Sequence, residues 1–335
     1  MKLKRLFKTT VYVAVAAALL AAGSMVWYAT TELPLTRKPL EFSLLTGSSL
    51  RSVARQMTEA GVLAEPLRFE ILARVLRKAP LVKAGNYEIE APLTPLALLK
   101  KITNGDYTQA AVTFIEGCTF REMRDLLAGQ TTLRHDSSAL TDAEIMQKLG
   151  SEQAAAEGSF FPDTYYFSAG ESDFAVLRRA RQLMQRRLAN EWARRDPGLP
   201  FTQPYEALIL ASIVEKETGR AEDRGMIASV FINRIKRGMK LQTDPTVIYG
   251  MGKSFDGNLR KRDLVADHPY NTYTRDGLPP TPIAMPSLAS LHAVLHPAKT
   301  DALYFVARGD GSSHFSRTLE EHERAVTKWQ KSGRR

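Results

Sequence analysis

The first feature of the hydrophobic pattern is an uncharged stretch, residues 11–30, that follows a basic amino terminus. About 20 apolar residues in a helix span a bilayer, so this stretch predicts a transmembrane anchor. Trp27 and Tyr28 lie at its far end, where aromatic rings favour the membrane interface. The basic side is expected to stay in the cytoplasm, and the rest of the chain is expected outside it. Small residues at 20–24 make a cleaved signal peptide the alternative, but the apolar run continues past them, which favours an anchor.

The pattern after the anchor predicts a linker and then a small α+β subdomain. Residues 31–40 contain two prolines and no apolar period, which is typical of a linker. Helical spacing begins at Leu50, with Ser49 as a candidate N-cap. The other expected elements are a strand at 41–45, a helix at 66–77, a strand at 83–89 and a helix at 94–103. This strand–helix–helix–strand order resembles a LysM-type carbohydrate-binding module, and a plain spacer is the alternative.

The remaining pattern predicts a mixed α/β domain, so the fold class expected for the whole chain is α+β. Beyond residue 240 the chain is rich in Pro, Gly, Asn, Tyr and Asp, which predicts long loops on a rigid scaffold. The expected elements are a strand at 111–115, an aromatic loop or short strand at 157–167, helices at 173–195, 205–218 and 221–238, a strand at 302–307 and a helix from Ser316 onward.

Composition and charge narrow the class of protein. Of the 335 residues, 44% are hydrophobic and 24% charged, which is ordinary for globular protein. The net charge of +10 suits an anionic partner, but no basic block with interleaved aromatics occurs, so nucleic acid is not expected. The single cysteine, Cys118, excludes an intramolecular disulfide and a cysteine-based zinc site. No histidine is near it in sequence, so a buried, inert thiol is expected.

The most informative chemistry lies at the end of the apolar helix predicted at 205–218. At 100° per residue, Glu217 continues the bulkiest apolar stripe, that of Leu210, Ile213 and Val214. A carboxylate against an apolar wall is disfavoured as the anion, so its pKa should rise toward that of a general acid. The alternative is an exposed helix end with ordinary surface charges. Glu215, on the face of smaller residues, is the second candidate.

Polar and aromatic residues in the following segments are candidates for holding a sugar. They are Gln242, Asp244, Tyr249, Tyr270 and Asn271. Their amides, carboxylate and phenols supply donors, acceptors and ring faces that sugars require. Ordinary turn chemistry is the alternative explanation for the same residues.

A histidine pair at helical spacing is the remaining candidate for chemistry. His292 and His296 lie four residues apart, a spacing that can hold a metal ion on one helix face. Pro297 follows directly and no acidic residue is adjacent in sequence. We therefore expect no metal site and no cofactor.

Several motifs in one order resemble the endolytic murein transglycosylase family, also called YceG-like. The resemblance runs from about residue 40 to the carboxyl terminus. It rests on the motifs at 211–218 (ASIVEKET), 229–235 (SVFINRI), 241–250 (LQTDPTVIYG), 270–273 (YNTY), 277–280 (GLPP) and 296–307 (HPAKTDALYFVA). In that family the second glutamate of Glu-Lys-Glu-Thr is catalytic, which implies that Glu217 is the catalytic residue here.

The resemblance also implies a mechanism and a setting. Glu217 would act as acid and then as base in a lyase reaction that cuts between MurNAc and GlcNAc of peptidoglycan and leaves a 1,6-anhydro end. The implied location is the inner (plasma) membrane, with the catalytic part outside the cytoplasm and peptidoglycan synthases as partners. The expected parts are a cytoplasmic tail (1–9), a transmembrane anchor (10–30), a linker (31–40), a LysM-like subdomain (41–108) and a catalytic domain (109–335).

Two other functional hypotheses remain at this stage. A non-enzymatic scaffold would bind glycan or wall-synthesis proteins and would be indifferent to substitution of Glu217. A metal-dependent envelope hydrolase would be silenced by a chelator.

Overall fold

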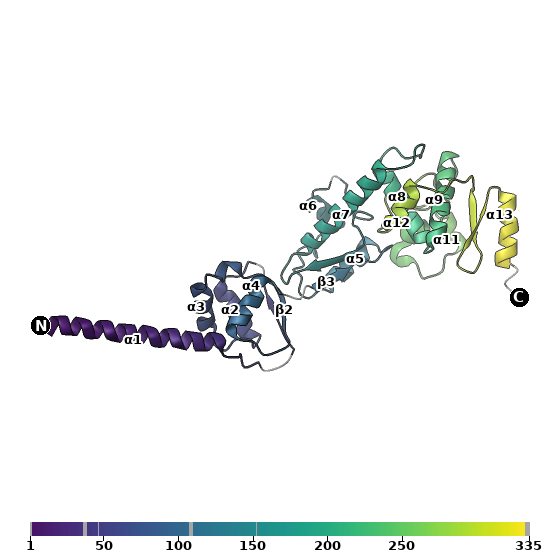
Figure 1. The fold of residues 1–335 in the computed structure, drawn as a ribbon. Helices are drawn as coiled ribbons and strands as arrows, with labels where there is room; N and C mark the ends of the chain where they lie inside the picture. The colour runs from purple at the N-terminus through teal and green to yellow at the C-terminus, as the bar shows by residue number, and fades with distance from the viewer. Residues whose placement is uncertain (1, 36–38, 46, 107–109, 152, 332–335) are drawn as a thin grey trace. The chain divides into compact units, whose positions relative to one another are not determined.

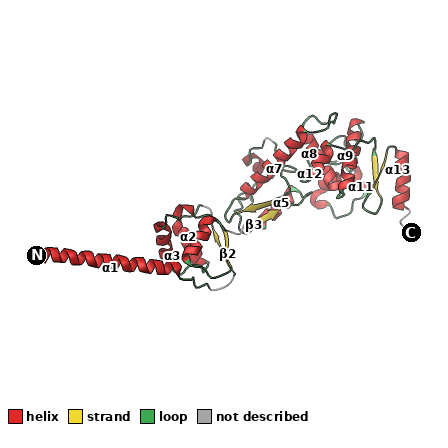
Figure 2. Ribbon diagram, viewed as in Figure 1, coloured by secondary structure: helices red, strands yellow, loops and turns green. Residues whose placement is uncertain are grey.

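The computed structural model describes residues 2–35, 39–45, 47–106, 110–151 and 153–331 (Figure 1). The expected linker residues 36–38 and the expected subdomain border at 108 and 109 lie outside the described residues. The fold is mixed α+β and mainly helical, with three two-stranded sheets in the part of the chain that the structure describes (Figure 2). The chain divides into two compact units. The first comprises residues 1–111 with 131–134 and 166–172, and the second comprises 112–130, 135–165 and 173–335.

Helix α1 (Lys2–Thr30) contains the expected anchor. Its segment Lys8–Thr30 has a mean hydropathy of 1.8, and it is the one helix among the described residues long and apolar enough to cross a membrane. The carboxyl end of this helix packs in the core of the first unit, where Tyr28 and Ala29 are each only 7% exposed. The carboxyl end of the anchor is therefore part of a folded unit.

The first unit has the strand–helix–helix–strand order that its pattern predicts. Strand β1 (Leu40–Leu44) pairs antiparallel with β2 (Gly85–Ile89), and alternate β1 side chains are buried. Ser49 caps the next helix as expected, accepting a 3.2 Å hydrogen bond from the Ser52 amide. The helical elements are α2 (Leu50–Glu59), α3 (Pro66–Val75), η1 (Ala79–Leu81) and α4 (Pro95–Asn104).

The second unit begins with a peripheral region of short elements. Strand β3 (Ala110–Thr113) forms a two-stranded sheet with β4 (Thr164–Phe167), and residues 112, 113, 164 and 165 of these strands belong to this unit. Thr119 and Thr141 each start a helix through a reciprocal capping box, in which the glutamate three residues later bonds back to the cap. The helices of this region are α5 (Phe120–Ala128), α6 (Asp142–Lys148) and the long α7 (Asp173–Ala193).

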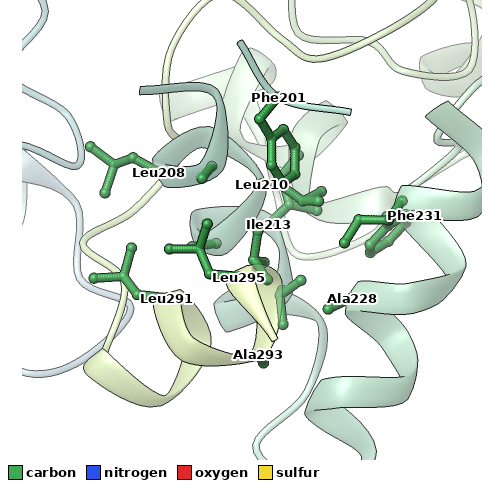
Figure 3. Close-up of a cluster of buried hydrophobic side chains, with 14 of the residues drawn as sticks. Phe201, Leu208, Leu210, Ile213, Ala228, Phe231, Leu291, Ala293 and Leu295 are labelled. Atoms are coloured by element: carbon green, nitrogen blue, oxygen red, sulfur yellow. The ribbon is translucent and has the colours of Figure 1, made fainter. Parts of the chain in front are cut away.

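The main core of the second unit lies between α8 (Pro204–Glu217), α9 (Ala221–Lys236) and α12 (Leu288–Leu295). Residues 207–214 of α8 are all buried, as the apolar run predicts. Figure 3 shows side chains of the three helices gathered in this core. Since the middle of α8 is buried, packing fixes the direction of the helix that carries Glu217 at its end.

The expectation of long loops beyond residue 240 was wrong for three segments, which form α10 (Asp244–Met251), α11 (Lys261–Val265) and α12. These helices have eight residues or fewer, too short for a clear 3.6-residue period, and local signals mark them instead. Pro245 lies in the first turn of α10, and Ser287 caps α12 by accepting from the Ser290 amide. A single 3₁₀ turn, η2 (Gly252–Ser254), follows α10.

The carboxyl-terminal region contains one strand that was not predicted. The expected late strand is β5 (Tyr304–Ala307), but it pairs antiparallel with β6 (Ser313–Ser316), where a helix start was expected. The final helix α13 (Leu319–Val326) begins only after that strand, with Thr318 as its cap, and continues into η3 (Thr327–Lys331).

Candidate active site

Glu217 is the last residue of α8 and is half-buried at the edge of the core. Its Oε2 accepts a hydrogen bond of 2.8 Å from the hydroxyl of Thr243. Burial raises the pKa of Glu217 to about 7, and the charge of Asp244 acts in the same direction. The Thr243 hydrogen bond and the charge of Arg234 oppose this rise. A large fraction of Glu217 is therefore protonated at neutral pH, as the apolar wall of α8 predicts.

Thr243 is held in place by a small network of buried threonines. Its amide donates to the hydroxyl of Thr272 at 3.1 Å, and its carbonyl accepts from the hydroxyl of Thr246 at 2.8 Å. The hydroxyls of Thr246 and Thr272 are 2.8 Å apart. All three threonines are at most 2% exposed. The donor to Glu217 therefore sits on a rigid support at the start of α10.

Arg234 is a buried cation on α9, and its side chain donates to backbone carbonyls near Thr243. Its Nε donates to the carbonyl of Leu303 and its Nη1 to the carbonyl of Leu241, both at 2.7 Å. Burial lowers the pKa of this guanidinium, but an arginine stays charged in proteins. Arg234 thus ties the segment before Gln242 to α9 and places a positive charge near Glu217.

Glu215, the second candidate, has a different environment. Its Oε2 accepts from the amide of Ser287 at 2.8 Å and from the Ser287 hydroxyl. Ser287 is the N-cap of α12, so this carboxylate stabilises the positive end of a helix dipole. The side chain of Glu215 therefore has a structural partner, whereas Glu217 has one neutral donor on a single oxygen.

Two of the candidate sugar-binding residues are exposed next to Thr243. Gln242 has a φ of 50°, a left-handed conformation that is uncommon for a residue with a side chain. Backbone strain of this kind clusters at functional sites. Asp244 is exposed and accepts a 2.6 Å hydrogen bond from the hydroxyl of Tyr273. Both side chains are close in sequence to the hydroxyl that contacts Glu217.

Two further candidates form an aromatic pair. The rings of Tyr249 and Tyr270 lie 4.9 Å apart between centroids at an angle of 58°. The Tyr249 hydroxyl donates to Glu157 at 3.1 Å, and the Tyr270 hydroxyl lies 2.6 Å from that of Thr281. The structure therefore brings together two tyrosines that are separated by a helix and a loop in the sequence.

Asn271 lies in a different setting, because it is only 1% exposed. Its side-chain amide donates to three backbone carbonyls, those of Asp263, Leu264 and Ala266, at 2.7 to 3.2 Å. Its Oδ1 accepts from the amide of Tyr273. These bonds stabilise the segment between α11 and Tyr273 and leave no donor of this amide for a ligand.

A cavity of about 860 Å³ in the second unit lies along α10. Pro245, Ile248, Tyr249 and Tyr270 line it, as does Lys216, the neighbour of Glu217. Glu217 itself is not among the lining residues, so the cavity adjoins the end of α8 rather than containing the carboxyl group. Its mixture of apolar, aromatic and charged walls suits a polar ligand with ring faces.

Glu157 lines the same cavity and was not singled out from the sequence. It is 8% exposed, and its two oxygens accept from the Phe120 amide at 3.0 Å and from the Tyr249 hydroxyl at 3.1 Å. Burial raises the pKa of Glu157 to about 7, against the opposing effect of these two hydrogen bonds. In the sequence, Glu157-Gly158-Ser159 has the composition of an ordinary turn, so no local signal marks it.

The two histidines have acidic partners, and the cysteine is buried. His292 Nδ1 is 2.9 Å from Glu191 Oε2, and His296 Nδ1 is 2.9 Å from Asp196 Oδ1. Glu191 lies near the end of α7 and Asp196 just after it. The acidic partners of the two histidines are therefore about 100 residues away in the sequence. Cys118 is buried, and burial raises the pKa of its thiol to about 12, which keeps it protonated and unreactive.

Comparison with known sequences places these features in a family. The sequence model of the YceG-like family matches residues 42–328, and the chain therefore belongs to that family. An endolytic murein transglycosylase of Bacillus subtilis is 31% identical over 311 residues, covering 88% of this chain and 86% of that protein. A protein of the same name from Streptococcus pneumoniae is 27% identical over 350 residues, covering 92% of this chain and 63% of that protein.

A solved structure shows the same relationship. The 2.6 Å crystal structure of a yceG-like protein from Listeria monocytogenes matches with a TM-score of 0.56 and 29% sequence identity. The match covers 86% of this chain and 98% of that one. The fold of this chain is thus similar to that of a solved relative.

Proposed function

We propose that this chain is an endolytic lytic transglycosylase that cleaves the MurNAc–GlcNAc bond of nascent peptidoglycan, with Glu217 as its acid and base. The observation that carries the proposal is the half-buried Glu217 carboxyl, with a pKa raised to about 7 and one neutral donor. The relatives named endolytic murein transglycosylase support the substrate class. A lytic transglycosylase uses no water as nucleophile, so it does not need the second carboxyl group of a glycoside hydrolase.

The proposed reaction uses the two oxygens of Glu217 differently. Because Thr243 donates to Oε2, the transferable proton sits on Oε1. This proton passes to the glycosidic oxygen as the bond to C1 of MurNAc breaks, and GlcNAc leaves with a new hydroxyl. The resulting carboxylate then takes the proton of the MurNAc C6 hydroxyl while O6 bonds to C1. The product is a 1,6-anhydroMurNAc end, and Glu217 is protonated again.

Thr243 and Arg234 stabilise the carboxylate form in this cycle. The hydrogen bond and the positive charge both lower the pKa of Glu217, while burial and Asp244 raise it. A catalytic group that donates and then accepts a proton works best when its pKa is near the operating pH. The opposing contributions keep the pKa of Glu217 near neutrality.

We assign the sugar contacts to Gln242, Asp244, Tyr249 and Tyr270. Gln242 and Asp244 are exposed beside Thr243, and the two tyrosine rings line the cavity along α10. Asn271 acts on the shape of the site instead, because its amide is occupied by backbone carbonyls.

The first unit and the anchor set the location of the reaction. We propose that the β1–α2–α3–β2 arrangement is a LysM-like module and that its own cavity of about 820 Å³, lined by residues of α2 and α3, contacts glycan. With α1 as a single-pass anchor, the second unit acts on the extracytoplasmic side of the inner membrane, beside peptidoglycan synthases. The enzyme would then cut strands near the membrane and end their elongation.

The test is mass spectrometry of uncrosslinked peptidoglycan strands incubated with the full-length chain in detergent. We expect anhydro-ended products, their loss in Glu217→Gln, and their retention in Glu215→Gln, whose amide oxygen still accepts from Ser287. Reducing ends would indicate a hydrolase instead. Activity that survives Glu217→Gln but not Glu215→Gln would reassign the catalyst, and silencing by a chelator would favour the metal-dependent hydrolase.

A further inference from the structure

The proposed mechanism uses one carboxyl group, yet a second carboxyl group is buried in the wall of the adjoining cavity. Glu157 is 8% exposed, and its side chain lines the cavity with Tyr249 and Tyr270. Burying a carboxyl group is costly, and an amide or an apolar side chain would fill the same space at lower cost. Its contacts with the Phe120 amide and the Tyr249 hydroxyl offset part of this cost, and its place in the cavity wall also allows contact with a ligand.

Glu157 and Glu217 are connected through one short helix. Thr243, immediately before α10, donates to Glu217, and Tyr249, six residues further along, donates to Glu157. At 1.5 Å rise per residue the backbones of Thr243 and Tyr249 are separated by roughly 9 Å along the helix axis. Residues at the two ends of α10 therefore contact the two carboxyl groups, and the helix links their positions.

Glu157 retains acceptor capacity after its contacts with the protein are counted. A carboxylate has about four acceptor positions. Two are used, one on each oxygen, by the Phe120 amide and the Tyr249 hydroxyl. The remaining positions are available to N–H or O–H donors of a ligand in the cavity. Such donors are abundant on N-acetylated sugars.

We propose that the cavity along α10 is a sugar-binding subsite in which Glu157 accepts hydrogen bonds from the N–H and O–H groups of an N-acetylated sugar. The neighbouring glycosidic bond is thereby placed at Glu217. This inference rests on the proposed function for the identity of the strand. Glu157 is a substrate-binding residue in this scheme and takes no part in proton transfer to the glycosidic oxygen.

The test measures binding without turnover. Full-length Glu217→Gln protein in detergent is titrated with uncrosslinked peptidoglycan strands, with and without the added substitution Glu157→Gln. We expect Kd to rise about tenfold, a factor that corresponds to roughly 1.4 kcal/mol. Glu323→Gln is the control, because it also removes one carboxylate of the second unit but is exposed and does not line the cavity. It should leave Kd unchanged.

A second variant probes the cavity without touching Glu157. Ala154 is exposed and lines the cavity, so Ala154→Trp should fill the opening and weaken binding while the melting temperature stays unchanged. Unchanged affinity in both variants would overturn the proposal. The proposal would also fail if Glu157→Gln lost affinity only because the protein unfolds, while Ala154→Trp bound the strands normally.

Kinetics in the otherwise unaltered enzyme separate this inference from the proposed function. Glu157→Gln alone should raise KM with little change in kcat, whereas Glu217→Gln should abolish kcat. An active Glu217→Gln enzyme would refute the acid/base assignment and leave the binding result standing. A Glu157→Gln enzyme with unchanged KM would refute the subsite and leave Glu217 in place.

Discussion

The hydroxyl of Thr243 donates a 2.8 Å hydrogen bond to Oε2 of Glu217 and so joins the start of α10 to the end of α8. In the proposed mechanism this contact directs the proton to Oε1, and it lowers the pKa of a carboxyl group that burial raises. Because Thr243 is itself held by Thr246 and Thr272, the contact is rigid. Removing it should disturb both the geometry and the titration of Glu217.

Thr243→Val tests this contact with little change in shape. The valine cannot donate, so the pKa of Glu217 should rise and kcat should fall by about tenfold, as expected for loss of a hydrogen bond worth roughly 1.4 kcal/mol. The pH profile of kcat should shift to higher pH. Thr103→Val is the control, because it removes a buried threonine hydroxyl in the first unit, where it bonds to carbonyls of its own helix. An unshifted profile in Thr243→Val would contradict the assigned role.

The activity should depend on the protonated form of Glu217. Since its pKa is about 7, kcat should be high at mildly acidic pH and fall as the pH rises through that value. The measurement is the rate of anhydro-end formation between pH 5 and 9. A rate that stays constant across this range would be inconsistent with Glu217 as the proton donor.

Stability should respond to the same group with a definite sign. The pKa of Glu217 is raised from 4.5 to about 7 in the folded protein, so the native state binds this proton more tightly than the unfolded state. Its contribution to stability is therefore present at low pH and is lost as the pH rises from about 4.5 to about 7. Glu217→Gln should raise the melting temperature at pH 8 more than at pH 4. Equal effects at both values would show that burial does not shift this pKa.

The features of this site that depend on residues close together in the sequence could be predicted, and those that depend on distant residues could not. The raised pKa of Glu217 could be predicted because the apolar stripe of α8 and the glutamate belong to one helix. Its catalytic role was implied by the family resemblance and stays a prediction. Ser49, a cap next to its own helix, was predictable for the same reason. Glu157 could not be identified, because its burial depends on partners 37 and 92 residues away, Phe120 and Tyr249. The acidic partners of His292 and His296 were missed for the same reason.

The short helices after residue 240 show a related limit. A helix of eight residues has little more than two turns, so α10 and α12 have too few positions to show a period. Their start signals, Thr243 with Pro245 and Ser287, are visible in the sequence. Such signals also occur in turns, and only packing against α8 distinguishes the two cases.

Gly158, next to Glu157, should be intolerant of substitution. Its φ is 74°, and a Cβ at this position would lie 2.5 Å from Pro282 side-chain atoms. Gly158→Ala therefore combines an unfavourable backbone conformation with a clash, and should destabilise the second unit by more than about 1 kcal/mol. Gly150→Ala is the control, since its φ is 72° but nothing lies within 4 Å of the added carbon. The difference between the free energies of unfolding of the two variants, measured with denaturant, gives the cost of the clash. Equal losses of stability would contradict the clash.

The packing of the end of α1 in the first unit predicts an effect of truncation. Tyr28 is 7% exposed, packs in the core of the first unit, and its ring lies 5.8 Å from the guanidinium carbon of Arg68. A fragment that begins at residue 31 lacks this ring, whereas one that begins at residue 25 retains it. Loss of a buried aromatic side chain costs roughly 3–5 kcal/mol. The shorter fragment should therefore show a lower melting temperature for the first unit, and Tyr28→Ala in the longer fragment should reproduce the loss. Equal melting temperatures would mean that the anchor helix ends independently of the unit that follows it.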